Sequence, residues 1–185
     1  MTNKVIAVTG GIGSGKSEVM RIIREQGYAT VSCDVLAMEV AERNDTAERV
    51  RDLLGEEFVE GSKLNRTAIR DKVFSDKELL IRYNAIFFDE IKRLLTERLS
   101  ELCGVVFVEI PVFDAFEFEW NAVWLVEAAD ELRINRAMLR DGSSKDTILK
   151  IADKQRICVE YTLKLTNNGS LDDLGEQVRR ALKSV

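Results

Sequence analysis

The chain has 185 residues, of which 45% are hydrophobic, enough for one domain or for one domain with a small insertion. The net charge of −5 excludes a global attraction to nucleic acid or to an anionic membrane. The complete lack of histidine excludes histidine triads, histidine metal sites and histidine acid–base catalysis. The three widely spaced cysteines favour a reduced, cytoplasmic setting over a disulfide framework or a zinc site. We expect neither a signal peptide nor a transmembrane segment, because no apolar run is long enough.

The first elements are expected to be a strand, a glycine-rich loop and a helix. Residues 4–9 form a mostly apolar run that is typical of a buried strand in a parallel sheet. After the loop, the apolar spacing predicts a helix over 16–26 that stops at Gly27. A second strand over 28–33 is expected to end at Asp34.

The segment 35–102 has a mainly helical pattern. Asn65 and Asp76 are suited to cap helices, because their side-chain oxygens can accept hydrogen bonds from the first free N–H groups. Residues 76–102 predict one long helix. Its apolar stripe consists of Leu80, Tyr83, Phe87, Ile91, Leu94 and Leu95. This block is too long for a simple crossover between two strands, so we interpret it as an insertion.

The rest of the chain alternates strands with helices. The predicted elements are strands at 105–110 and 122–127, helices at 130–140 and 144–160, a strand at 162–166, a turn at 167–169 and a final amphipathic helix. This alternation predicts an α/β fold with a parallel sheet.

The stretch "TGGIGSGKSE" (9–18) contains the complete phosphate-binding pattern, Gly10-x-x-x-x-Gly15-Lys16-Ser17. In such a loop, backbone N–H groups surround phosphate oxygens, and the following helix directs its positive dipole end at the same anion. Lys16 is expected to reach the β- and γ-phosphates, and the Ser17 hydroxyl to ligate magnesium. The residues expected to hold the nucleotide here are Gly11, Ile12, Gly13, Ser14, Gly15, Lys16 and Ser17. The alternative is a tight strand–helix turn without a ligand. We therefore predict binding of a nucleoside triphosphate with Mg²⁺.

Two carboxylates are candidates at the ends of predicted strands, where open parallel sheets bind their ligands. Asp34 could accept the proton of an attacking hydroxyl or help to hold magnesium, and its alternative role is the N-cap of a helix that starts at Val35. Glu109 ends the strand 105–110 and could assist magnesium, although strand ends often carry solvated charges.

Three arginines, Arg133, Arg136 and Arg140, follow a spacing of i, i+3 and i+7 on one side of a predicted helix. Arginine binds phosphate and neutralises a phosphoryl group during transfer. The alternative is a solvated charged face. The polar segment 140–146 is suited to a lid over the nucleotide.

Several stretches resemble the successive motifs of dephospho-coenzyme A (dephospho-CoA) kinases. They are "VTGGIGSGKS", "CDVLA", "LNRTAIRDKVFSD", "YNAIFFDEI", "VVFVEIPVF", "RAMLRDGSS" and "LTNNGS". The resemblance extends from about Val5 to Val178. It implies transfer of the γ-phosphoryl group of ATP to the ribose 3′-hydroxyl of dephospho-CoA, the last step of coenzyme A (CoA) synthesis.

The resemblance also implies a P-loop kinase three-layer fold with a five-stranded parallel sheet, a helical acceptor-binding insertion and a lid. The implied nucleotide-binding core covers 1–34 and 104–185, with a lid near 136–150, and the insertion covers 35–103. In this family pattern Asp34 is the general base, acting with Lys16 and with Arg140 of the lid. Arg136 joins the nucleotide site, and Asn167 and Gly169 match the motif near the adenine.

The chain departs from the family pattern at Phe88-Asp89, where the family has His-Pro, and at Glu109, where it has an aspartate. Asp89 would repel an acceptor diphosphate, so we expect dephospho-CoA to bind with an elevated Michaelis constant. Two alternatives are a nucleoside or deoxynucleoside monophosphate kinase on the same scaffold and a non-catalytic nucleotide-binding regulator. We expect a small-molecule substrate, no nucleic acid or membrane partner, and a monomer in the cytoplasm.

Overall fold

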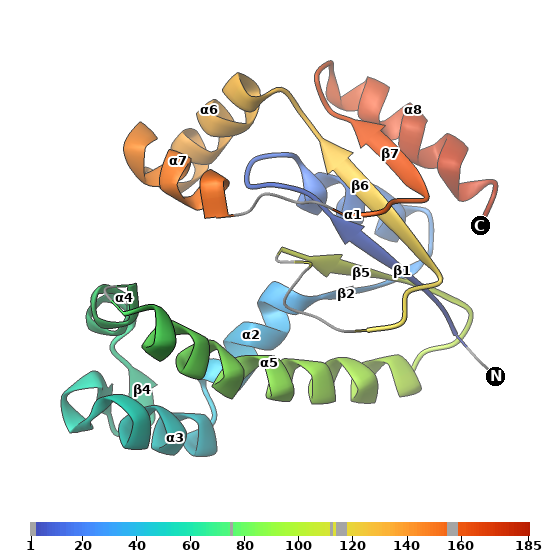
Figure 1. Ribbon diagram of the computed structural model, residues 1–185. Coiled ribbons are helices and arrows are strands. Elements are labelled where there is room, and N and C mark those ends of the chain that lie inside the picture. Colours follow the sequence, from blue (N-terminus) through green and yellow to red (C-terminus); the bar gives the residue numbers. More distant parts are fainter. Residues whose placement is uncertain (1–2, 75, 112, 114–117, 155–158) are drawn as a thin grey trace. The chain divides into compact units, whose positions relative to one another are not determined.

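The computed structural model describes residues 3–74, 76–111, 113, 118–154 and 159–185 (Figure 1). The chain divides into two compact units. One unit contains residues 1–32 and 99–185, and the other contains residues 33–98. These limits differ by a few residues from the expected 1–34, 35–103 and 104–185. The first boundary falls earlier because the first helix of the second unit already starts at Cys33, and the second boundary, after residue 98, also falls earlier than expected. We call the two units the nucleotide unit and the helical unit.

The nucleotide unit is built on a parallel sheet with the strand order β2-β5-β1-β6-β7. The strands are β1 (Lys4–Thr9), β2 (Ala29–Ser32), β5 (Val105–Ile110), β6 (Ala122–Glu127) and β7 (Leu163–Thr166). The apolar runs of β1, β5 and β6 are largely buried, as expected for central strands that are covered on both faces, whereas the edge strands β2 and β7 are more exposed. The predicted five-stranded parallel sheet is confirmed.

Two helices, α1 (Lys16–Glu25) and α8 (Leu171–Leu182), cover one face of this sheet and contact each other. The core on that face joins side chains of β1, β5, β6 and β7 with the apolar stripes of both helices. Phe107 lies at its centre, with edge-on ring contacts to Tyr28 and Trp124. Because side chains alternate along a strand, Glu109 lies on the same face of β5 as Phe107, which is the face of α1.

The second strand and the helix before β7 are shorter than predicted. β2 ends at Ser32, and Cys33 and Asp34 already belong to α2 (Cys33–Ala41), where Cys33 turns into the core. The helix predicted over 144–160 is α7 (Lys145–Lys154), and residues 155–158 lie outside the described residues. Thr162 donates its N–H to Val123 O, at 2.9 Å, so hydrogen bonding to β6 begins one residue before β7.

The helical unit contains α2, α3 (Asn44–Leu54), the 3-10 helix η1 (Glu56–Phe58), α4 (Arg66–Phe74) and most of α5 (Lys77–Ser100). A small hairpin of β3 (Val59–Glu60) and β4 (Lys63–Leu64) lies within the segment 35–102, whose pattern predicted mainly helices. Asn65 and Asp76 accept hydrogen bonds from the first turns of α4 and α5, which confirms both predicted caps. A separate apolar core includes Val50, Ile69 and Ile86.

Two further helices of the nucleotide unit follow β6. The first is α6 (Asp130–Asp141), and α7 packs against it. Gly142 ends α6 in the left-handed conformation, with φ of 61°, which glycine adopts readily. Among all described residues, no helix has the length and apolar character needed to cross a membrane.

Candidate nucleotide and acceptor sites

The phosphate loop joins β1 to α1 at the carboxyl end of the central strand. Gly13 and Gly15 have φ values of 73° and 101°, a left-handed conformation that residues with a Cβ rarely adopt. Gly15 is also the N-cap of α1, and no side chain caps this helix end. The first N–H groups of α1 and the positive end of its dipole are therefore suited to an anion.

Neighbouring groups pack closely against the loop. A Cβ at Gly10 would overlap the carbonyl oxygen of Val126, and a Cβ at Gly15 would overlap the amide of Asn167. Gly11 and Gly13 lie in the same way against Arg133 of α6. Packing with β6, α6 and the end of β7 thus requires the same glycines that a phosphate would require.

The side chains of the motif have partners within the unit. Lys16 Nζ donates to Gly10 O at 2.7 Å and to Gly11 O at 3.2 Å, so its ammonium lies against the loop carbonyls. Ser17 Oγ donates to Glu109 Oε1 at 3.0 Å, and Glu109 is only 7% exposed. A hydroxyl and a buried carboxylate next to a phosphate loop are oxygen ligands of the kind that Mg²⁺ prefers. The residues present therefore fit a magnesium ion shared with a nucleotide.

The turn after β7 is tied to the phosphate loop and to α6. Asn167 is 3% exposed, and its Nδ2 donates to Ser14 O at 2.9 Å. Arg136 donates to Asn167 O at 3.0 Å, and Ala129 N donates to Asn168 Oδ1 at 2.7 Å. The structure thus brings Arg136 and Asn167 together beside the loop. Asn168 lies in the stretch "LTNNGS" and in the predicted turn, but the sequence assigned it no role, because its contact with Ala129 depends on the fold of the turn.

Two other predicted site residues, Gly169 and Arg140, lie next to the start of α8 and at the end of α6. A Cβ at Gly169 would overlap the Asp173 carboxylate, which forms a capping box with Ser170 at the start of α8. Arg140 forms two hydrogen bonds with Asp141, at 2.6 and 2.8 Å, and these bonds keep the pKa of Asp141 below its ordinary value. Neither contact involves the phosphate loop.

The helical unit has its own pocket, with a volume of about 440 Å³. It is lined by Asp34, Ala37, Met38, Ala41, Arg66, Ile69, Arg70, Tyr83 and Phe87. Asp34 is the second residue of α2, so it lies within the first helical turn and does not act as the N-cap that we considered. Phe87, and not the departing pair Phe88-Asp89, lines this pocket.

Charged and aromatic groups converge in this pocket from three helices. Arg66 and Arg70 stand one turn apart on α4, and both are exposed. Tyr83 and Phe87 of α5 are in ring contact, with centroids 5.1 Å apart. Burial raises the pKa of Tyr83, and the nearby charge of Arg66 opposes this rise. The sequence placed Tyr83 and Phe87 on the apolar stripe of the long helix and gave no signal for Met38, and the convergence of these three residues in a pocket depends on helix packing.

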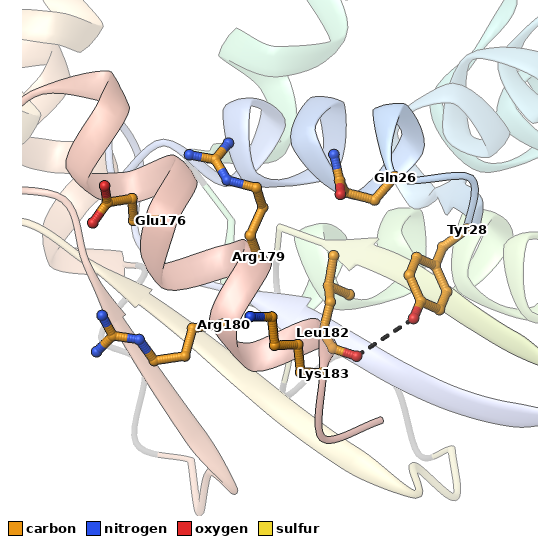
Figure 2. Close-up of a pocket in the computed structure, with 7 residues that line it drawn as sticks. All are labelled: Gln26, Tyr28, Glu176, Arg179, Arg180, Leu182 and Lys183. Carbon is orange, nitrogen blue, oxygen red and sulfur yellow. Dashed lines mark hydrogen bonds between the residues drawn. The ribbon is translucent and has the colours of Figure 1, made fainter.

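A second hollow lies at the far end of α1 from Lys16 (Figure 2). It has a volume of about 570 Å³ and is lined by Gln26, Tyr28, Glu176, Arg179, Arg180, Leu182 and Lys183. Tyr28 donates its hydroxyl to Leu182 O at 3.4 Å. Its cations lie at the C-terminal end of α8, where positive charge offsets the helix dipole. Their positions are explained without a ligand.

The sheet order, the phosphate loop and the Ser17–Glu109 pair define a P-loop kinase fold. The structure of TT1252 from Thermus thermophilus matches all of this chain and 98% of its own, with a TM-score of 0.87 and 36% identity. A structure of shikimate kinase from Acinetobacter baumannii in complex with shikimate matches 99% of this chain and 94% of its own, with a TM-score of 0.53. It is 17% identical and therefore supports the fold alone.

Sequence comparison identifies the family within this fold. The family model for dephospho-CoA kinase matches residues 4–172. The dephospho-CoA kinase of Thermus thermophilus is 39% identical over 190 residues, which cover 98% of this chain and 89% of that enzyme. The one from Streptococcus pyogenes is 28% identical, with 98% of both chains covered. The chain belongs to the dephospho-CoA kinase family, and it is therefore a kinase.

Proposed function

We propose that this chain uses ATP and Mg²⁺ to phosphorylate the ribose 3′-hydroxyl of dephospho-CoA, giving CoA and ADP. The observation that carries the proposal is the extent of the family match. It covers residues 4–172, which include the phosphate loop of one unit and the whole pocket of the other. A chain that shared only nucleotide binding with the family would match over the nucleotide unit alone.

The phosphate loop holds the triphosphate through backbone N–H groups and the N-terminus of α1. Lys16 releases the carbonyls of Gly10 and Gly11 and directs its ammonium to the β- and γ-phosphates. There it neutralises the negative charge that the leaving ADP oxygen gains as the Pγ–O bond breaks. The two carbonyls keep Lys16 close to this position before the nucleotide binds.

Ser17 and Glu109 hold Mg²⁺ in this proposal, since they are the paired oxygen donors next to the loop. The ion, when bound with ATP, supplies positive charge to the β- and γ-phosphate oxygens. Ser17→Ala removes one of its ligands and is expected to raise the Mg²⁺ concentration required for half-maximal activity. Glu109→Gln should act in the same direction.

Asp34 is the general base in this proposal, and the pocket that it lines binds the acceptor. The oxygen of the 3′-hydroxyl attacks Pγ, the proton passes to the Asp34 carboxylate, and ADP leaves with the electron pair of the broken bond. Arg66 and Arg70 suit the diphosphate of dephospho-CoA, because guanidinium groups pair with phosphate oxygens. Tyr83 and Phe87 offer ring surfaces to the less polar parts of the acceptor.

Arg140 completes the site as a lid residue. It gives up its two hydrogen bonds with Asp141 and binds the γ-phosphoryl group instead. The wall of the nucleotide site near the adenine is formed, in this proposal, by Arg136, Asn167 and Gly169. A monomer is part of this proposal as the favoured working form. A cytoplasmic location follows from the intracellular substrates of this reaction.

The test is product formation from dephospho-CoA and ATP, with the product identified by mass spectrometry. The proposal expects a product one phosphate heavier, with stoichiometric ADP. An acceptor whose 3′-hydroxyl is replaced by hydrogen should give no product. If this analogue is phosphorylated as fast as dephospho-CoA, the proposed position of transfer is wrong.

A further inference from the structure

One arginine of α6 covers the outer turn of the phosphate loop. Arg133 NH1 donates to Ile12 O at 3.5 Å, and its guanidinium lies where a Cβ of Gly11 would be. The backbone carbonyl of Arg133 lies in the same way against Gly13. The Arg133 side chain therefore follows the loop from Gly11 to Ile12, while its backbone adjoins the next residue.

Burial separates Arg133 from a merely solvated charge. Its side chain is 19% exposed, whereas that of Arg140 on the same helix is 62% exposed. Arg133 NH2 also pairs with Asp130 Oδ1 at 2.5 Å, one turn earlier on α6. The Asp130 carboxylate, which is itself 82% exposed, is thus a second partner of the guanidinium that contacts the loop.

The contact from Arg133 does not depend on Lys16. In the proposed reaction Lys16 leaves Gly10 O and Gly11 O to reach the phosphates, so the loop loses two hydrogen bonds on that side. The contacts of Arg133 come from α6 and use other atoms of the loop. They are therefore available at the moment when the Lys16 contacts are given up.

We propose that Arg133 is a positioning residue that keeps Gly11–Gly13 in the shape that receives the triphosphate. The proposal rests on ATP binding by this loop, as argued above. It also explains why residue 11 is a glycine. Gly11 does not have a positive φ, so its backbone would accept alanine, and the contact with Arg133 is what excludes a Cβ there.

This reasoning offers two independent ways to break one contact. Arg133→Ala removes the guanidinium, and Gly11→Ala pushes it aside without backbone strain. Arg180→Ala is the matched control, since it removes an exposed guanidinium from α8 in the hollow of Figure 2, outside the proposed machinery. The Kd of a non-hydrolysable ATP analogue with Mg²⁺ is measured by calorimetry, and kcat at saturating ATP is measured alongside.

We expect Arg133→Ala and Gly11→Ala each to raise the Kd about fivefold to tenfold, the scale of one ordinary hydrogen bond, with the kcat of Arg133→Ala changed by less than about twofold. The double variant should be no weaker than the weaker single variant, because both remove the same contact. Fold-changes that multiply, or Kd values equal to that of Arg180→Ala, would overturn the proposal.

Amide hydrogen exchange without nucleotide gives a second readout. Exchange at residues 11–14 should become faster in Arg133→Ala and stay unchanged in Arg180→Ala. If the unchanged protein does not bind the ATP analogue, the proposed function fails, and the exchange rates still test the role of Arg133. Equal exchange rates in all three proteins would overturn that role by themselves.

Discussion

The two candidate sites of this chain differ in the groups that form them, which are mainly backbone in one site and side chains in the other. In the nucleotide unit the site is mainly backbone, with glycines packed under Val126, Arg133 and Asn167. In the helical unit the pocket is made of side chains from α2, α4 and α5, with arginine, carboxylate and aromatic groups around about 440 Å³. A backbone site requires one short stretch of sequence, whereas a side-chain pocket requires that distant residues converge. A backbone site therefore tolerates few substitutions, whereas substitutions in a side-chain pocket can change the ligand that it binds.

The largest effect is expected where the backbone site depends on a single charge. Lys16→Ala should lower kcat/KM roughly a thousandfold and weaken ATP binding, because no other loop side chain brings positive charge to the β- and γ-phosphates. Steady-state kinetics with ATP as the varied substrate measures this change. Lys183→Ala, in the hollow of Figure 2, is the control and should match the unchanged protein. Equal kinetics for both variants would contradict the nucleotide site.

Asp34→Asn tests the chemical group of the side-chain pocket. It should lower kcat about a hundredfold or more, the usual scale for a general base, and leave the Kd of ATP and the melting temperature unchanged. Asparagine keeps the size of the side chain and so preserves packing in the first turn of α2. A lower melting temperature with intact turnover would instead assign Asp34 to helix stability.

The two arginines of α6 should separate binding from catalysis. Arg140→Ala should lower kcat about tenfold to a hundredfold with little change in the KM for ATP, because its contact to the γ-phosphoryl group forms mainly in the transition state. Arg136→Ala should instead raise the Kd of ATP, since Arg136 supports Asn167 beside the loop. Small and equal effects at both positions would favour a solvated helix face.

Arg66→Ala and Arg70→Ala should show the selectivity of the helical unit. Each is expected to raise the KM for dephospho-CoA about tenfold, the loss of one charged hydrogen bond, while the KM for ATP stays constant. Arg82→Ala is the matched control, because Arg82 is exposed on α5 and does not line the pocket. A change in the KM for ATP alone would contradict the separation of the two sites.

The smallest expected effect concerns the start of α8. The Ser170 hydroxyl and the Ser170 N–H donate to Asp173 Oδ2, at 2.7 and 2.9 Å, and they lower the pKa of Asp173. This stabilisation is present above the unfolded-state pKa of about 4 and is lost as pH falls through the lower folded-state value. Ser170→Ala should lower the free energy of unfolding by about 1 kcal/mol at pH 7, and by less at pH 3. Denaturant unfolding at both pH values measures it, and equal losses would contradict the capping box.

Much of the nucleotide unit could be predicted from sequence, because its signals are local. The apolar run of 4–9, the glycine pattern and the alternation of strands and helices follow from short-range rules. Asp34 shows where such rules fail. The apolar pattern runs through Cys33, so the strand seemed to continue, but Cys33 turns into the core as the first residue of α2.

The helical unit was predictable in its helices and caps but not in its pocket. Asn65 and Asp76 predict where α4 and α5 start, because they cap these helices through local hydrogen bonds. Tyr83 and Phe87 are one turn apart on the predicted apolar stripe of α5, so their ring contact follows from periodicity. Their convergence with Asp34 and with the arginines of α4 depends on how three helices are arranged, which periodicity does not specify. The expectation for Phe88-Asp89 came from comparison with the family pattern. Phe87, and not this pair, lines the pocket, and the effect of Asp89 on the acceptor stays a prediction.

The most direct test of the proposed activity is a comparison of acceptors. ADP release is measured with ATP, Mg²⁺ and, in separate reactions, dephospho-CoA, AMP, CMP, dTMP or dGMP, with a reaction lacking acceptor as the baseline. We predict the highest kcat/KM for dephospho-CoA and rates near the baseline for the four monophosphates. A monophosphate that is turned over with a higher kcat/KM than dephospho-CoA would contradict the proposed acceptor, and ADP release that no acceptor accelerates would contradict the kinase activity.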